Sequence, residues 1–382
     1  MSAVSGAVET APVSDLHALG STDPEYFEVP GGREEEWRFT PLRRLRGLHK
    51  DAELTQAGVT VEVEAAPEVS VERIDPRERA GATVAGPFLP PDRVSARAFA
   101  AVTEATVLTV PQETTATAPT YVRVTGTGTE TATAGHLIID VRAYGRATVV
   151  IDQRGSATYA DNVEIRVADG GDLTVVALAD WASDTVQVAH HEAVLGRDAR
   201  LTHFAVTLGG SLVRLSPTVR YAGQGGDAAQ YGICFADAGQ HLEHRLFVDH
   251  DTPNCKSRAL YKGALSGNDA HTVWIGDVLI RPAATGTDTY EYNRNLVLTE
   301  GAHADSVPNL EILTGEIVGA GHASANGRLD DEHLFYLMAR GIPFDEARRL
   351  VIRGFFGELI AKIGIPELEE RIMSVIEAEL AS

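Results

Sequence analysis

The stretch GRATVVIDQRGSATYADNVEIRVADGGDLTVVAL, residues 145–178, decides the fold. It holds three apolar runs rich in β-branched residues, at 147–151, 163–167 and 173–178, with polar and glycine-containing turns between them. β-Branched residues favour strands, and glycine and aspartate favour the tight turns that connect strands. The stretch therefore predicts consecutive short strands with no helix between them.

A turn of the same kind recurs along the chain. Its last residue falls at positions 147, 173, 199, 228, 270 and 304, at intervals of 26, 26, 29, 42 and 34 residues. Repeats of this length are typical of solenoids, in which one coil cannot bury its inner face alone but stacked coils share a core. The two longest intervals indicate insertions or a turn that the pattern misses.

We therefore predict a mainly β protein whose body, residues 105–327, is a parallel β-helix. A β-sandwich is the structural alternative, because it also consists of short strands and turns. The repeat period favours the β-helix.

Residues 1–104 are expected to form a mixed N-terminal region. The first thirty or so are small and polar, so we expect them to be mobile. Residues 58–64 alternate like a strand, and residues 94–103 fit a short helix.

Residues 328–382 are expected to form a C-terminal helical domain. They carry three amphipathic patterns, and Asp330 and Asp345 are placed to cap the first two helices. This region fits both a helical cap on the end of the solenoid and a docking surface for a partner. Taken by itself, the pattern favours the cap.

Composition restricts the class of partner. The formal net charge is −21, whereas phosphate binding needs clustered lysine and arginine, so we do not expect a nucleic-acid partner. We find no apolar run long enough to cross a bilayer, and the N-terminus lacks the basic start and apolar core of a signal peptide. We therefore expect a cytoplasmic protein with no membrane partner and with reduced thiols.

Several catalytic motifs are missing from the sequence. The phosphate-binding pattern GxxxxGK[ST] is absent, so we expect no ATP site in this chain, and neither HExxH nor GxSxG occurs. Cys234 and Cys255 cannot supply the four thiolates of a self-contained cluster. A carbohydrate-active β-helix enzyme stays an alternative, but its best acid candidates, Glu243 and Asp249, are isolated.

Three histidines surround these two carboxylates, in the segment QHLEHRLFVDH at residues 240–250. On a strand, His241 and Glu243 would face one side, while His244 and His250 would face the other. Because alternation divides the group, we interpret it as polar residues on an exposed sheet face and not as a metal site.

Cys255 and His322 are the two remaining candidates for metal chemistry. A lone cysteine is usually a buried packing residue, but Lys256 and Arg258 would lower the pKa of an exposed thiol. His322 lies in GAGHAS, where small neighbours leave an imidazole accessible, although a plain surface histidine is the more common case. The 67 residues from 255 to 322 correspond to two or three coils, or roughly 10–14 Å, so one ion could not bind both. A metal site at His322 would need ligands from another chain.

Several segments together resemble the SufB/SufD family of iron–sulfur cluster assembly scaffolds, and its SufD type in particular. The main ones are HDTPNCKSR at 250–258, DTYEYNRNLVL at 288–298, PNLEI at 308–312, His322, and LDDEHLFYLMARGI at 329–342. Weaker support comes from EWRFT at 36–40 and AFAAVT at 98–103.

The resemblance implies a right-handed parallel β-helix that pairs with a SufB-like subunit, and a C-terminal part that docks a SufC-like ABC ATPase. The chain itself would be a non-catalytic scaffold subunit, with ATP hydrolysis in SufC. An iron–sulfur cluster would be assembled transiently with SufB, with a cysteine desulfurase system as an indirect partner. Some family complexes also bind reduced flavin, for which the sequence indicates no site.

The resemblance also implies site residues. The histidine that family members place at the SufB interface matches His322, with Cys255 as a second candidate. Many relatives carry a cysteine two positions before that histidine, where this chain has Ala320, so SufB would supply the thiolates. The candidates for contact with SufC are Leu334, Phe335, Tyr336, Arg340 and Phe355.

Overall fold

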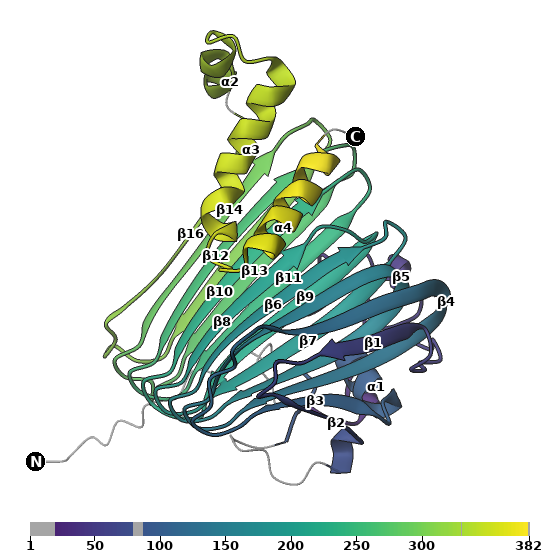
Figure 1. Ribbon diagram of the computed structural model, residues 1–382, viewed down its shortest axis with the longest axis vertical. Helices are drawn as coiled ribbons and strands as arrows, with labels where there is room; N and C mark the ends of the chain where they lie inside the picture. The colour runs from purple at the N-terminus through teal and green to yellow at the C-terminus, as the bar shows by residue number, and fades with distance from the viewer. Residues whose placement is uncertain (1–19, 79–86, 330, 381–382) are drawn as a thin grey trace, which may run out of the picture.

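The computed structural model describes residues 20–78, 87–329 and 331–380. The body is a continuous sheet that winds into a solenoid of about eight turns (Figure 1). The long strands β4 (Thr120–Val141) and β5 (Arg146–Val167) cross both faces, so that the first half of β5 pairs with β6 and the second half with β7. Strands β4 to β16 pair with one another in parallel, which confirms the predicted parallel β-helix and excludes a sandwich.

After β5, each turn contributes one strand to each of two facing sheets, which we call the even sheet and the odd sheet. The even sheet contains β6 (Asp172–Trp181), β8 (Arg200–Thr207), β10 (Asp227–Ala236), β12 (Lys256–Leu265), β14 (Asp288–Val297) and β16 (Gly319–Arg328). The odd sheet contains β7 (Val186–Leu195), β9 (Leu212–Tyr221), β11 (His241–His250), β13 (His271–Ile280) and β15 (His303–Ile312). The last rungs are therefore β15 and β16.

The irregular repeat in the sequence has a simple structural cause. Even strands begin at residues 172, 200, 227, 256, 288 and 319, so each turn adds 27 to 32 residues. The predicted turns at 226–228 and 268–270 precede β10 and β13, which belong to different sheets. The 42-residue interval arises because the pattern misses the turn before β12 and passes to the odd sheet.

The space between the two sheets, here called the lumen, holds the main apolar core. Residues in register on parallel neighbours point to the same face, so each apolar position is repeated from rung to rung. Members of this core from both sheets are Leu173, Val175, Leu201, Ala228, Val213, Val219, Leu242, Val248 and Val278.

The residues before β4 form a mixed region over the first turns of the solenoid. β1 pairs antiparallel with β4, and β2 pairs antiparallel with β3, which is itself parallel to β4. Asp92 caps α1 by accepting a hydrogen bond from the backbone N–H of Ser95. The elements are η2 (Pro24–Tyr26), η3 (Glu35–Trp37), η4 (Leu42–Arg44), β1 (Val59–Glu64), β2 (Ser70–Ile74), η5 (Pro76–Glu78), α1 (Arg93–Ala101) and β3 (Ala105–Val110).

The segment predicted to be mobile is only partly described. Residues 1–19 lie outside the described residues. In the following part, Arg93 of α1 donates hydrogen bonds to the backbone oxygens of Pro24 and Phe27 and forms an ion pair with Glu25 at 2.8 Å. These contacts hold η2 against α1.

Three helices follow the last strand: α2 (Asp331–Met338), α3 (Phe344–Ile360) and α4 (Pro366–Glu379). The second half of α3 and the whole of α4 lie along the outer face of the even sheet, while α2 projects beyond it (Figure 1). The expectation of a cap on the solenoid end is therefore wrong. The helices bury Ile352, Phe356, Leu359, Ile372 and Ile376 against Val176, Phe204, Ile233 and Phe235.

The helix starts also differ from the predicted ones. The cap position of α3 is Pro343, which makes no side-chain hydrogen bond, and Asp345 lies inside the first turn, so the cap predicted at Asp345 is wrong. Asp330, the other predicted cap, lies outside the described residues. Among the helices of the described ranges, none is long and apolar enough to span a bilayer.

Candidate functional site

The solenoid ends in two strands whose outer edges are open. β15 pairs with β13 and β16 pairs with β14, and neither has a second strand partner within residues 20–78, 87–329 and 331–380. Their backbone groups on that side are available for another strand.

His322 lies on β16, at this open end. It is in register with the buried Glu291 of β14 and with Ala259 of β12, so its side chain is directed to the lumen side of the sheet. Because no further rung covers it among the described residues, His322 is exposed. The neighbouring Ala320 faces the same side and adds no ligand atom.

Cys255 lies in a different environment. It directly precedes β12, two rungs before β16, and its side chain is buried, with Sγ 3.6 Å from the backbone oxygen of Gly223. Burial raises the pKa of the Cys255 thiol to about 11. Arg258, expected to activate the thiol, instead pairs with Asp288 at 2.6 Å. The condition for an activated Cys255, an exposed thiol, is not met.

The strand register also separates Cys255 from His322. Lys256 is in register with Gly319 through β14, and His322 lies three residues further along β16. Two rungs and four residues correspond to roughly 16 Å, so the two residues do not share a ligand shell.

The five candidates for ATPase contact divide into separate groups. Phe335 and Tyr336 of α2 are 73% and 55% exposed, and Arg340, in the turn after α2, stacks on the Tyr336 ring at 4.3 Å. Leu334 is buried, and Phe355 lies further along α3, where the Lys262 ammonium is 5.3 Å from its ring. The exposed apolar surface also includes Met338, Phe344 and Leu350.

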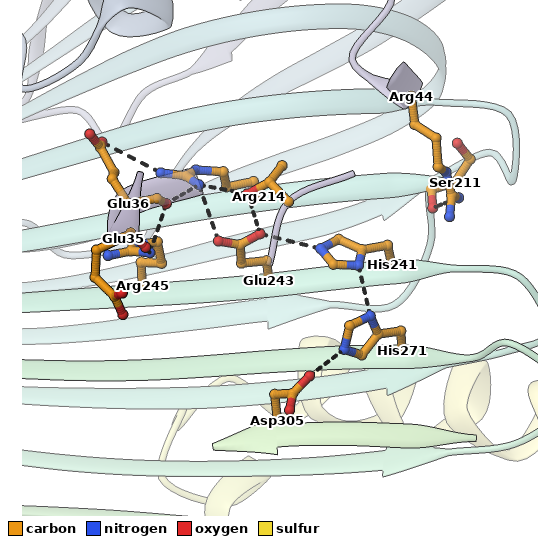
Figure 2. A network of polar contacts seen from close by, with 11 residues as sticks. Glu35, Glu36, Arg44, Ser211, Arg214, His241, Glu243, Arg245, His271 and Asp305 are labelled. Carbon is orange, nitrogen blue, oxygen red and sulfur yellow. Dashed lines mark hydrogen bonds and ion pairs between the residues drawn. The ribbon is translucent and has the colours of Figure 1, made fainter. Parts of the chain in front are cut away.

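A buried ion-pair network lies on the outer face of the odd sheet, beneath residues 35–44 (Figure 2). Arg214 of β9 donates to Glu243 of β11 at 3.1 Å and to Thr40 Oγ1 at 2.7 Å. Thr40 in turn donates to Glu243 at 2.7 Å, and the Trp37 ring covers the guanidinium at 3.8 Å. The network therefore joins the N-terminal region to the solenoid.

The charges in this network are balanced by their partners. Burial alone would raise the pKa of Glu243, but Arg214 and the His241 hydrogen bond outweigh it and lower this pKa to about 2. Glu36 lies 3.5 Å from Arg214, and burial together with the negative charge of Asp92 raises its pKa to about 7. Glu243 is thus an ionised carboxylate whose charge is neutralised.

From Glu243 the polar contacts continue toward the open end (Figure 2). His241 Nε2 is 3.2 Å from Glu243 Oε2, and its Nδ1 is 3.2 Å from Nδ1 of His271 on the next rung. His271 Nε2 is 2.8 Å from Asp305 Oδ2 on β15, and His303 Nε2 is 3.3 Å from Asp305 Oδ1. The chain thus runs from a buried ion pair to an exposed imidazole.

These observations correct one interpretation of the sequence. The alternation is as expected, since His241 and Glu243 face outward and His244 faces the lumen, where it contacts Thr207 at 2.9 Å. The face is not exposed, however, because His241, Glu243, His244 and His250 are all at least 97% buried. Residues of the N-terminal region cover His241 and Glu243, and no local sequence pattern predicts this contact.

The sequence reasoning missed His271, His303 and Asp305. His241, His271 and His303 occupy the same register position on three successive odd strands, 30 and 32 residues apart. The spacing within the odd sheet alone shows this column of histidines, whereas the turn pattern mixes positions from both sheets.

The lumen contains a second polar group near the open end. Neither carboxylate oxygen of Glu291 has a hydrogen-bond partner in the described part of the chain, and the same holds for Tyr261 Oη and Trp274 Nε1. Burial, together with the negative charge of Asp277, raises the pKa of Glu291 to about 8. Glu291 is therefore held mainly as the neutral acid at neutral pH.

The carboxylates proposed for a carbohydrate-active enzyme are already paired. Glu243 is bound by Arg214, and Asp249 accepts two hydrogen bonds from Arg281 at 2.7 and 3.0 Å. Both are buried, so they do not form the solvent-accessible acid pair that glycoside hydrolysis needs.

Comparison with known proteins agrees with the fold. Residues 123–355 match the family described as "SUF system FeS cluster assembly, SufBD core domain". The chain is similar to an iron–sulfur cluster assembly SufBD family protein of Mycobacterium bovis, with 55% identity over 99% of this chain and 96% of the relative. A relative of the same description from Mycobacterium leprae is 54% identical, over 100% of this chain and 97% of the relative. The iron–sulfur cluster assembly protein SufD of Escherichia coli is 27% identical, over 56% of this chain and 51% of its own length. The chain therefore belongs to the SufBD family of iron–sulfur cluster assembly proteins.

Proposed function

We propose that this chain is a SufD-type scaffold subunit, non-catalytic by itself, that pairs with a SufB-like subunit and docks a SufC-like ATPase. The open last rung is the observation that carries the proposal. Two parallel sheets end together at β15 and β16, and an edge of this kind is a template for a strand of another chain. A partner with the same kind of open edge would continue both sheets.

The position of His322 supports a shared cluster site at this junction. The exposed imidazole stands on the terminal strand, and neither Cys255 nor Cys234 accompanies it, since both thiols are buried elsewhere. Thiolate ligands for a nascent cluster would come from the SufB-like partner. The cluster is cargo here, assembled transiently between the two chains, and a cysteine desulfurase would supply the sulfur. Reduced flavin would belong to the assembled complex.

The exposed surface of α2 and the first half of α3 supports the ATPase contact. Phe335, Tyr336, Met338, Phe344 and Leu350 are 41–73% exposed on α2 and the first half of α3. Large apolar side chains exposed on two helices that contact each other are typical of a protein interface. We propose that Phe335, Tyr336 and Arg340 contact SufC directly, with Leu334 and Phe355 supporting the helices from within.

Co-expression with a SufB-like chain and a SufC-like ATPase, followed by affinity capture through this chain, tests the proposal. We expect all three chains to be recovered together. The Phe335→Ala/Tyr336→Ala variant should lose the ATPase and keep the SufB-like chain, whereas Tyr26→Ala, an exposed aromatic at the other end, should keep both. Recovery of wild-type protein as a stable monomer that binds neither partner would contradict the proposal.

The cluster site needs a separate measurement. We expect anaerobic reconstitution of the complex with His322→Ala to give less cluster than wild type, measured by absorption and by bound iron and sulfide. A complex that assembles normally and yields as much cluster as wild type would remove His322 from the mechanism.

A further inference from the structure

We propose that His271, His303 and Asp305 form a mononuclear binding site for a divalent transition-metal ion on the outer face of the odd sheet. The site lies on the last two odd rungs and is separate from His322, which stands on the even sheet. The inference goes beyond the proposed function, because all three ligands come from this chain and need no partner.

The backbone brings the three ligands together. His271 and His303 are in register on β13 and β15, and Asp305 lies two residues after His303, so all three side chains share one face. One ligand atom from each residue lies within 4.8 Å of the other two. Ligand atoms at about 2.1 Å from an ion in tetrahedral geometry are roughly 3.4 Å apart, so small side-chain adjustments close the shell.

The contact between His271 and Asp305 shows which ring nitrogen of His271 faces the site. His271 Nε2 lies 2.8 Å from Asp305 Oδ2, and a proton on the imidazole or a metal ion bound by both atoms satisfies this contact. His271 Nδ1 is directed to His241, so Nε2 is the ring nitrogen that is directed to the proposed site.

The hydrogen bonds of His241 and Glu243 also fix the ring of His271. Metal-binding histidines usually donate their other ring N–H to an acceptor that is itself held in place, which sets the tautomer and raises ligand basicity. Here Nδ1 of His271 lies 3.2 Å from Nδ1 of His241, and the buried Glu243–Arg214 pair holds His241 in place. The rigid part of the site is thus built into the solenoid, and the exposed part is His303.

An ion can reach the site from solvent. A cavity of about 290 Å³ adjoins it, lined in part by Phe39, Arg44, His241, His271 and His303. The side chain of His303 is 69% exposed, and those of His271 and Asp305 are each 27% exposed. Arg44, the nearest cation of the lining, is held by the backbone oxygens of Ser211 and Gly239. Solvent molecules can therefore complete the coordination.

The ligand set selects a class of metal. Two imidazoles and one carboxylate suit Zn²⁺, Fe²⁺, Co²⁺ and related ions, whereas Ca²⁺ and Mg²⁺ prefer all-oxygen sites. With no thiolate among the three ligands, the site would hold a single ion and not a cluster.

The test uses the purified full chain after removal of metals by a chelator. Co²⁺ is titrated and followed by its visible d–d absorption, and Zn²⁺ and anaerobic Fe²⁺ are followed by equilibrium dialysis. We expect one ion of each to bind per chain, with imidazole-type Co²⁺ bands. His303→Ala and Asp305→Asn should each weaken binding at least about tenfold without changing the unfolding midpoint of the metal-free protein.

Glu316→Gln is the matched control, since it removes an exposed carboxylate near the same end of the solenoid but outside the three ligands, and it should bind metal like wild type. The proposal is overturned if wild-type protein binds no stoichiometric ion, if His303→Ala binds as tightly as wild type, or if only Glu316→Gln loses the ion. Capture of the partner chains is a separate readout, so loss of partner binding with intact metal binding would contradict the proposed function alone.

Discussion

Arg214 and Glu243 form a fully buried ion pair on neighbouring odd strands, with Nη1 3.1 Å from Oε1. Thr40 and Trp37, more than 170 residues earlier, complete its surroundings. The pair therefore attaches the N-terminal region to the solenoid and also anchors the row of histidines that leads to the open edge.

Glu243→Gln should destabilise the protein by about 3–5 kcal/mol, because it leaves the Arg214 charge buried without its counter-charge. Chemical denaturation followed by circular dichroism measures the free energy of unfolding. Glu346→Gln, which breaks the exposed Arg349–Glu346 pair, is the control and should cost less than about 1 kcal/mol. Equal losses in the two variants would contradict the role assigned to the buried pair.

Glu291→Gln should make stability less dependent on pH. The folded pKa of Glu291, about 8, lies above the 4.5 that is usual for glutamate, so between these values the folded state holds a proton that the unfolded state has released. The stability that the protonated acid contributes is complete below the unfolded pKa and is lost as pH rises toward about 8. We expect the free energy of unfolding of the variant, relative to that of wild type, to rise by a few kcal/mol as the pH increases through this window. Chemical denaturation at several pH values measures both free energies. Glu300→Gln, at an exposed site, should show no such trend.

Both cysteines should resist alkylation in the folded protein. Burial raises the pKa of Cys234 to about 12 and that of Cys255 to about 11, and the thiolate is the reactive species. We expect negligible iodoacetamide labelling of native protein at about pH 8 and complete labelling in concentrated guanidinium chloride, by mass spectrometry. Rapid native labelling of Cys255 would restore it as a candidate for sulfur chemistry.

Phe356→Ala should cost about 3–5 kcal/mol of unfolding free energy, because this side chain is fully buried between α3 and the even sheet. Phe335→Ala, at a position 73% exposed on α2, should change stability by less than about 0.5 kcal/mol. The two variants thus distinguish a side chain that packs the helices on the solenoid from a side chain that is available to a partner. A large loss of stability in Phe335→Ala would show that this ring packs within the chain.

Much of the architecture could be predicted from local patterns. β-Branched runs with turns every 26 to 29 residues indicated the coils of the solenoid, because strand and turn preferences act over a few neighbouring residues. The same local logic indicated β1, α1 and the presence of C-terminal helices. It failed at residue 270, where a pattern without spatial information could not show that the chain had passed to the other sheet.

The chemistry of individual residues depended on distant parts of the chain. Cys255 has basic neighbours in sequence, yet the backbone of an adjacent turn buries its thiol. The alternation of residues 240–250 predicts an exposed face for His241 and Glu243, but residues 35–44 cover it. Such burial and pairing depend on contacts between residues that lie far apart in the sequence, so no short stretch of sequence predicts them.

The sequence by itself thus determined the repeating strands, the helical end and the family, since each of these rests on patterns within one segment. Only the tertiary structure decided which polar residues meet. Stacking the odd rungs in register places His271 beside His303 and Asp305. The stack of described rungs ends at β15 and β16, so no rung in the described part of the chain covers His322. Register between strands 30 or more residues apart is set by the packing of the whole solenoid, and it is this register that creates both candidate sites.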